Sequence, residues 1–183
     1  GGSHVNVGLI THLHMDHIGY AGYGGFWSLI EEQGITFDKI IDRDAGIWQD
    51  GLDGSVPDGT CNYETEIAWH NAGSISNTSR KWLCYATNPA NVLVYGWREI
   101  AKFGSTTQID PPDAEVIITI LQVDATELMM VDGETPVAGD HTADAIPPNE
   151  NDYSTALKIT YGEIDYITAG DGGEAAHAMI VET

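Results

Sequence analysis

Basic residues are scarce in this sequence. Its 183 residues include 7 lysines and arginines against 28 aspartates and glutamates, which gives a formal net charge of −21 at pH 7. A chain of this charge repels polyanions and offers no basic track for a nucleic-acid backbone, so long nucleic acid is disfavoured as a partner. A strongly acidic surface suits an extracellular or high-salt setting, and we therefore expect a secreted protein.

Long apolar runs are also missing. No stretch approaches the roughly 20 apolar residues that a membrane-spanning helix needs, and the first residues, 1–4, show no signal-peptide pattern. This start is compatible with a processed end or a fragment end. Neither a Gly-x-Ser-x-Gly motif nor a phosphate-binding P-loop occurs, which argues against a serine hydrolase and an NTPase.

Cysteine is limited to Cys61 and Cys84. The two do not form a CxxC pair, so a zinc knuckle is not indicated. A disulfide closing a loop of roughly 20 residues and a pair of buried free thiols remain equally open. The sequon at 77–79 is compatible with secretion.

The remaining pattern predicts one α/β domain over residues 1–183, with 42% hydrophobic residues and an irregular insertion at about 43–90. Short apolar, β-branched runs predict strands, and residues 154–160 and 164–168 predict a hairpin. Helical spacing is expected around 26–33, with further helical segments at 78–86 and a helical turn at 97–103. The expected single strands are 5–10, 39–42, 92–95, 114–123 and 127–131.

The end of the first expected strand carries four metal-ligand side chains. His12 and His14 alternate like strand residues, so both imidazoles can point the same way. Asp16 and His17 follow where the chain turns and can aim at a second point nearby. Imidazole together with carboxylate suits zinc, with manganese or iron as alternatives, and two such ions can share one water. The sequence therefore predicts a site for two metal ions.

This run of His-x-His-x-Asp-His after an apolar strand resembles the signature of the metallo-β-lactamase superfamily. Residues 151–154 (Asn-Asp-Tyr-Ser), the hairpin and residues 168–171 (Thr-Ala-Gly-Asp) resemble one branch of it. That branch contains the hydrolase domain of competence DNA-uptake proteins and related secreted bacterial hydrolases. The resemblance implies an αββα sandwich and covers most of the chain.

The resemblance also implies a role for each motif residue. His12 and His14 would hold one metal ion, and Asp16 and His17 the other. Asp171 would bridge the two ions, and Asp16 would also orient the attacking water. From the residues alone, Asp171 reads as an ordinary turn aspartate.

Two features depart from the family pattern. The pair of strands that usually precedes the first motif is missing, and so is the family's late histidine, because only His177 follows Asp171. We therefore expect a fragment of the sandwich, incomplete at both ends. His141 is the candidate for the family's intermediate histidine, and a loop histidine without a ligand role is the alternative. His4 and His70 are read as histidines without a ligand role.

The expected function is a metal-dependent hydrolase acting on a phosphodiester through a metal-activated water. A lactone or β-lactam hydrolase is the first alternative. A non-enzymatic metal-binding or assembly protein that keeps the fold is the second, and sheet edges exposed by truncation would then favour self-association.

Overall fold

The structure is a computed structural model that describes residues 3–19, 24–43, 47–48, 65–67, 78–79, 82, 86, 97–122 and 149–172. Several predicted features lie outside these residues. They are the strands at 92–95 and 127–131, both cysteines (Cys61 and Cys84), the sequon at 77–79 except its last two residues, and the histidines His70, His141 and His177.

A parallel three-stranded sheet positions the histidine motif. Its strands are β1 (His4–Leu9), β2 (Thr36–Asp42) and β5 (Trp97–Ile100), in the order β1-β2-β5. Both strand pairs are parallel. Parallel neighbours need a crossover connection, and the one between β1 and β2 contains the helices α1 (Met15–Ile18) and α2 (Gly25–Glu31).

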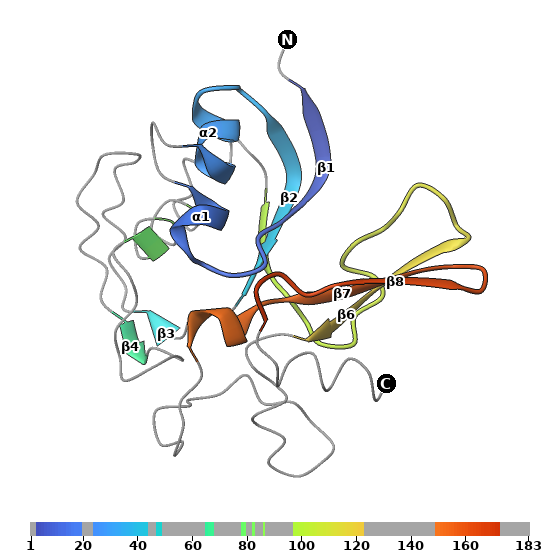
Figure 1. Cartoon of the computed structure of the whole chain (residues 1–183). Helices are drawn as coiled ribbons and strands as arrows, with labels where there is room; N and C mark the ends of the chain where they lie inside the picture. Colours follow the sequence, from blue (N-terminus) through green and yellow to red (C-terminus); the bar gives the residue numbers. More distant parts are fainter. Residues whose placement is uncertain are drawn as a thin grey trace.

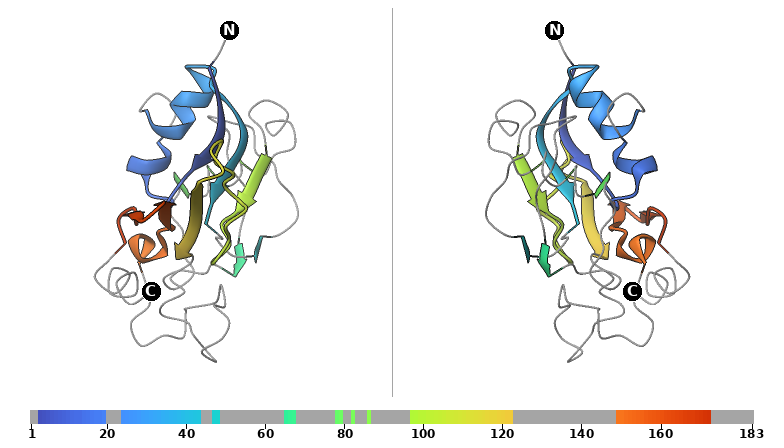
Figure 2. Two further views of the ribbon diagram at one scale, coloured as in Figure 1. Left: turned by 90° about the vertical axis from the view of Figure 1, so that its right-hand side faces the viewer. Right: turned by 90° about the vertical axis from the view of Figure 1, so that its left-hand side faces the viewer.

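The two helices cover one face of this sheet (Figure 1; Figure 2). The core beneath them is apolar: Phe26 stacks on Phe37 with ring centroids 5.2 Å apart and meets Trp82 edge-on at 6.2 Å. Burying a large apolar side chain stabilises the fold by roughly 1.5–3 kcal/mol. The buried members of this cluster are Ile10, Leu13, Ile18, Ile30, Phe37, Ile40, Trp82 and Ala86.

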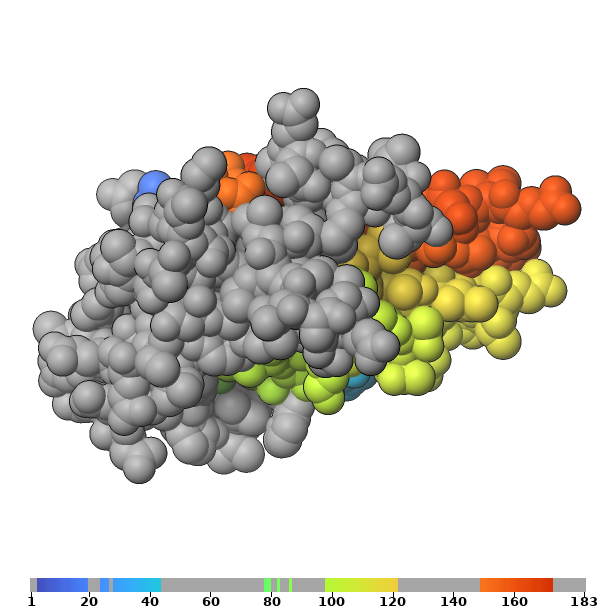
Figure 3. Space-filling model, turned by 90° about the horizontal axis from the view of Figure 1, so that it is seen from below, coloured from blue at the N-terminus to red at the C-terminus, as the bar shows by residue number. Residues whose placement is uncertain are grey.

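An antiparallel sheet packs on the opposite face. Its strands are β6 (Val116–Gln122), β7 (Ala156–Tyr161) and β8 (Ile164–Thr168), in the order β6-β7-β8. A second buried cluster joins the two sheets, because it combines Ile41 of β2 with Ile120 of β6 and Leu157 of β7. The tips of β6, β7 and β8 extend at one end of the molecule (Figure 3).

Smaller elements complete the described part of the chain. Strands β3 (Ile47–Trp48) and β4 (Thr65–Ile67) form a short antiparallel pair. The 3-10 helix η3 (Glu150–Tyr153) leads into β7. Thr78, Ser79, Trp82 and Ala86 are helical, in agreement with the expected helix at 78–86.

The strands predicted at 5–10, 39–42 and 114–123 are confirmed with small shifts of their ends, as are the hairpin and the helix at 26–33. The helical turn predicted at 97–103 is wrong, because residues 97–100 form β5 beside β2. Local helical propensity there gives way to sheet pairing and to the ion pair of Arg98 with Asp42.

The described layers are helices, a parallel sheet and an antiparallel sheet. A second helical layer, which the αββα sandwich requires, is not found among the described residues, so that architecture stays a prediction. In the same part of the chain, no helix has the length and apolar character needed to cross a membrane.

The end of α1 and the start of α2 lie against each other at Gly19, which contacts the backbone of Gly24 and Gly25. Gly19 has φ 76° and ψ −172°, a region that is essentially restricted to glycine, and a Cβ there would lie 1.9 Å from the carbonyl oxygen of Gly24. We expect Gly19→Ala to lower the free energy of unfolding by roughly 2–5 kcal/mol, measured by urea denaturation.

Gly34→Ala is the matched control. Gly34 also has a positive φ, 63°, but a Cβ there meets open space. Its replacement should cost only the backbone strain of about 1–2 kcal/mol. Equal losses in the two variants would contradict the proposed contact.

Candidate metal centre

The histidine motif occupies the loop that leaves β1. The backbone N–H of Ile10 donates to the carbonyl of Ile41 at 2.9 Å, and that of Thr155 donates to the carbonyl of Thr11 at 2.8 Å. The chain bends at His12 and is extended at His14, the N-cap of α1, whose carbonyl accepts from the N–H groups of both His17 and Ile18. With this backbone, the imidazoles of His12 and His14 lie close to each other.

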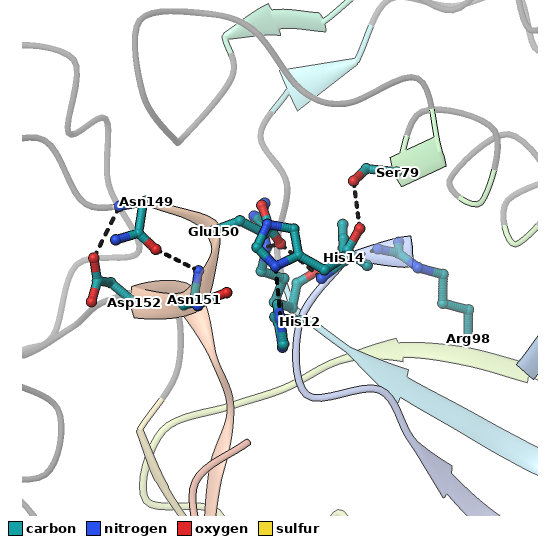
Figure 4. A network of polar contacts seen from close by, with 10 residues as sticks. His12, His14, Ser79, Arg98, Asn149, Glu150, Asn151 and Asp152 are labelled. Atoms are coloured by element: carbon teal, nitrogen blue, oxygen red, sulfur yellow. Dashed lines mark hydrogen bonds and ion pairs between the residues drawn. The ribbon is translucent and has the colours of Figure 1, made fainter. Parts of the chain in front are cut away.

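His12 and His14 face each other through their ring nitrogens. Nε2 of His12 lies 3.1 Å from Nδ1 of His14 (Figure 4). Two ligands of a tetrahedral metal with bonds of about 2.0–2.1 Å lie roughly 3.3–3.4 Å apart, close to this separation. His12 is fully buried and His14 half-buried, so the pair lies at the wall of the site rather than on open surface.

His17 meets a carboxylate from the far end of the described chain. Its Nε2 lies 3.4 Å from Oδ2 of Asp171 and 3.8 Å from Oδ2 of Asp16. The rings of His12 and His17 have centroids 4.0 Å apart. One ligand atom each of His12, His17 and Asp171 lies within 4.8 Å of the others, which is a grouping able to hold a metal ion.

The turn after β8 delivers Asp171 to this cluster. Gly170 has φ 56°, and a Cβ there would lie 2.8 Å from both Cβ and Oγ1 of Thr11 and 3.2 Å from Oγ of Ser154. Only glycine therefore fits between the turn and the histidine loop. The convergence of the two segments, which the sequence analysis required, is present in the structure.

Thr11 contacts the rear of two imidazoles. Its Oγ1 lies 3.3 Å from Nδ1 of His12 and 3.4 Å from Nδ1 of His17. A hydroxyl oxygen has two acceptor positions, so it can accept from both Nδ1–H groups and leave both Nε2 lone pairs directed at the site. Metal-binding histidines generally have such a partner on their second nitrogen.

His12 is held neutral by its surroundings. Burial, together with the charges of His17 and His14, lowers the pKa of His12 from 6.5 to about 4, against a weaker opposing effect of Glu150 and Asp171. A neutral imidazole has the lone pair that metal coordination requires. At pH values well above 4, His12 is therefore in the form that could coordinate a metal ion.

The main chain of Leu13, between the two facing histidines, is fixed on both sides. Its N–H donates to Oε1 of Glu150 at 2.7 Å, and its carbonyl accepts from Oγ of Ser79 at 2.7 Å (Figure 4). Its side chain is fully buried in the helix-side core. The loop is thus anchored through residues far away in sequence.

A buried ion pair supports Glu150. Its two carboxylate oxygens accept from Nε of Arg43 at 2.8 Å and from Nη2 at 2.5 Å, and the guanidinium lies 4.7 Å from the ring centroid of Tyr153. Beside it, Asp42 accepts from the Trp82 indole at 2.9 Å and pairs with Arg98 at 2.8 Å. These contacts tie the ends of β2 and β5 to the histidine loop.

Sequence reasoning identified the ligand candidates but not their supports. The structure brings together His12, His14, Asp16, His17 and Asp171, while His141 lies outside the described residues. Glu150, Arg43 and Ser79 were missed, because single charged or hydroxyl residues give no local pattern. An arginine directly after an apolar strand, at position 43, was the signal that the sequence offered.

His4 lies apart from this site, at the start of β1. It pairs with Asp38 at 3.1 Å and with the hydroxyl of Thr36 at 2.9 Å. Its lack of a ligand role stays a prediction. No match to this chain was found among protein-family models, curated proteins or solved structures. The donor set and its geometry therefore carry the assignment of chemistry.

The lowered pKa of His12 predicts a pH dependence of stability in metal-free protein. Between pH 6.5 and about 4 the unfolded chain protonates this histidine while the folded chain keeps it neutral. The unfolded state then binds more protons, so this contribution to stability is lost as the pH falls through that window.

His12→Gln isolates the effect from that of other titrating groups. The difference in free energy of unfolding, wild type minus variant, should shrink as the pH is lowered from 7 to 4 in a chelator-treated urea series. A difference that stays constant over this range would show that burial does not hold His12 neutral.

Proposed function

We propose that this chain is the metal-binding domain of a dinuclear metal-dependent hydrolase of the metallo-β-lactamase type, acting on phosphodiesters. The observation that carries the proposal is that a short segment with three histidines meets the carboxylate of Asp171, which lies far away along the chain. The contacts are Nε2 of His12 with Nδ1 of His14 at 3.1 Å, and Nε2 of His17 with Oδ2 of Asp171 at 3.4 Å.

The donor set fits zinc, and manganese or iron are the alternatives. His12 and His14 would hold one ion, Asp16 and His17 the other, and Asp171 would contribute to both. The grouping of Asp171 with both His12 and His17 supports this bridging role. When bound, a pair of ions supplies Lewis acidity, which lowers the pKa of water toward neutrality and neutralises negative charge that develops on the substrate.

The chain's own residues prepare the site for this chemistry. Thr11 orients two imidazoles, and burial keeps His12 unprotonated. Asp16, 74% exposed and 3.8 Å from His17, would orient the attacking water at the open side of the site.

Charge narrows the substrate class. The net charge of −21 opposes binding of a long polyanion, and the guanidinium of Arg43 is buried against Glu150. A small phosphodiester or a phospholipid head group meets less repulsion than a nucleic acid. A lactone or β-lactam is the alternative substrate class.

A non-catalytic assembly role is the second candidate function. It is favoured by apolar side chains at the tip of the antiparallel sheet, where Ile164 is 70% exposed and Tyr166 61% exposed. Exposed strands of this kind invite pairing with another chain. One or no metal ion per chain, together with fixed oligomers and no turnover, would support this role over the enzyme.

Hydrolysis of bis-p-nitrophenyl phosphate by zinc-loaded or manganese-loaded protein tests the proposal. We expect two ions per chain and measurable turnover. His14→Ala should reduce turnover by at least about 100-fold, because the first ion loses one of its ligands. His4→Ala is the matched control and should keep wild-type activity, since His4 pairs with Asp38 away from the site.

Full activity in the His14→Ala variant would defeat the hydrolase proposal. Hydrolysis of a lactone or β-lactam without hydrolysis of the phosphodiester would show that the proposed substrate class is wrong. The proposed metal centre would be unaffected by that result.

A further inference from the structure

Glu150 contacts the histidine loop from a position 137 residues away along the chain. We propose that Glu150, held in place by Arg43, is a positioning residue that sets the angle between the two facing histidines. This inference rests on the proposed metal-dependent function. It assigns a role to a carboxylate that is not itself one of the metal ligands.

The two peptide groups around Leu13 are each held by a side chain from a distant segment. Each peptide group is planar, so its orientation fixes the directions of the residues on both sides. Glu150 holds the peptide between His12 and Leu13 through the Leu13 N–H, and Ser79 holds the next peptide through the Leu13 carbonyl. Rotation of either peptide would break a 2.7 Å hydrogen bond and turn an imidazole away from its partner.

Glu150 is itself held in place at its backbone and at its carboxylate. Its backbone begins the 3-10 helix η3, whose first turn is capped by two hydrogen bonds: the N–H of Asn149 donates to the carboxylate of Asp152, and the N–H of Asn151 donates to the side-chain oxygen of Asn149 (Figure 4). The Arg43 guanidinium donates a hydrogen bond to each of the two carboxylate oxygens of Glu150. Glu150 is therefore held at its backbone and at its oxygens. Its position determines where the Leu13 N–H, and with it the histidine loop, must lie.

The burial of Arg43 explains why the acceptor of the Leu13 N–H is a charged residue. The Arg43 side chain is fully buried and that of Glu150 only 10% exposed. A buried guanidinium is costly unless a carboxylate meets it, and the two-point geometry of arginine orients that carboxylate. The ion pair thus fixes the direction from which the Leu13 N–H is held.

Zinc affinity and the visible spectrum of the cobalt-substituted protein test this role. Glu150→Gln keeps an acceptor oxygen but removes the charge that Arg43 requires. We expect zinc affinity, measured by chelator competition, to fall by about 10–100-fold, as for other residues that orient metal ligands. We also expect the cobalt absorption bands to shift, because the ligand geometry changes.

Two comparisons complete the design. Glu163→Gln makes the same charge change in the exposed turn between β7 and β8 and should leave both readouts at wild-type values. The double variant Arg43→Met/Glu150→Gln removes both buried charges, so it guards against misfolding of the single variant. It should still show weaker zinc binding and an altered spectrum.

Wild-type zinc affinity and an unchanged cobalt spectrum in Glu150→Gln, or in the double variant where the single one does not fold, would overturn the positioning role. Failure of the wild-type chain to bind zinc at all would instead overturn the proposed function. The two failures are therefore distinguishable.

Discussion

The hydrogen bonds that join the loop after β1 to residues 149–155 determine the arrangement of the site. Thr11 accepts from the backbone of Thr155, and Leu13 donates to Glu150. Through these two contacts, segments from opposite ends of the described chain share one rigid surface. The ligand candidates at 12, 14 and 17 then meet the carboxylate of Asp171, which reaches them through the glycine turn after β8.

Burial gives this surface its chemical character. A fully buried His12 with a pKa near 4 stays neutral, and Thr11 contacts the ring nitrogen that faces away from the site. The exposed carboxylates of Asp16 and Asp171 line the outer side. A neutral His12 on the inside and acidic groups on the outside suit a divalent cation. The acidic surface of the whole chain adds to that attraction, while it opposes large anionic substrates.

Much of this arrangement follows from the sequence, because strands with strong apolar patterns such as β1 and β6 are visible without coordinates. The His-x-His-x-Asp-His run also predicts metal binding from the sequence alone, since four ligand residues share one short segment. Asp171 was assigned only by resemblance, for a turn aspartate carries no signal of its own. The segment of β5 was predicted to be helical because local propensity contains no information about its pairing with β2, which is distant in sequence. Arg43 and Glu150 could not be paired in advance, since their 107-residue separation is bridged only by the fold.

The convergence of two ligand pairs on two metal ions is the central claim, and anomalous diffraction from the zinc-loaded protein tests it most directly. We expect two zinc peaks roughly 3.5–4 Å apart. One peak should lie next to the facing nitrogens of His12 and His14, the other next to Nε2 of His17, with the carboxylate of Asp171 between them. Zinc bound elsewhere, or an Asp171 carboxylate directed away from both peaks, would contradict the account.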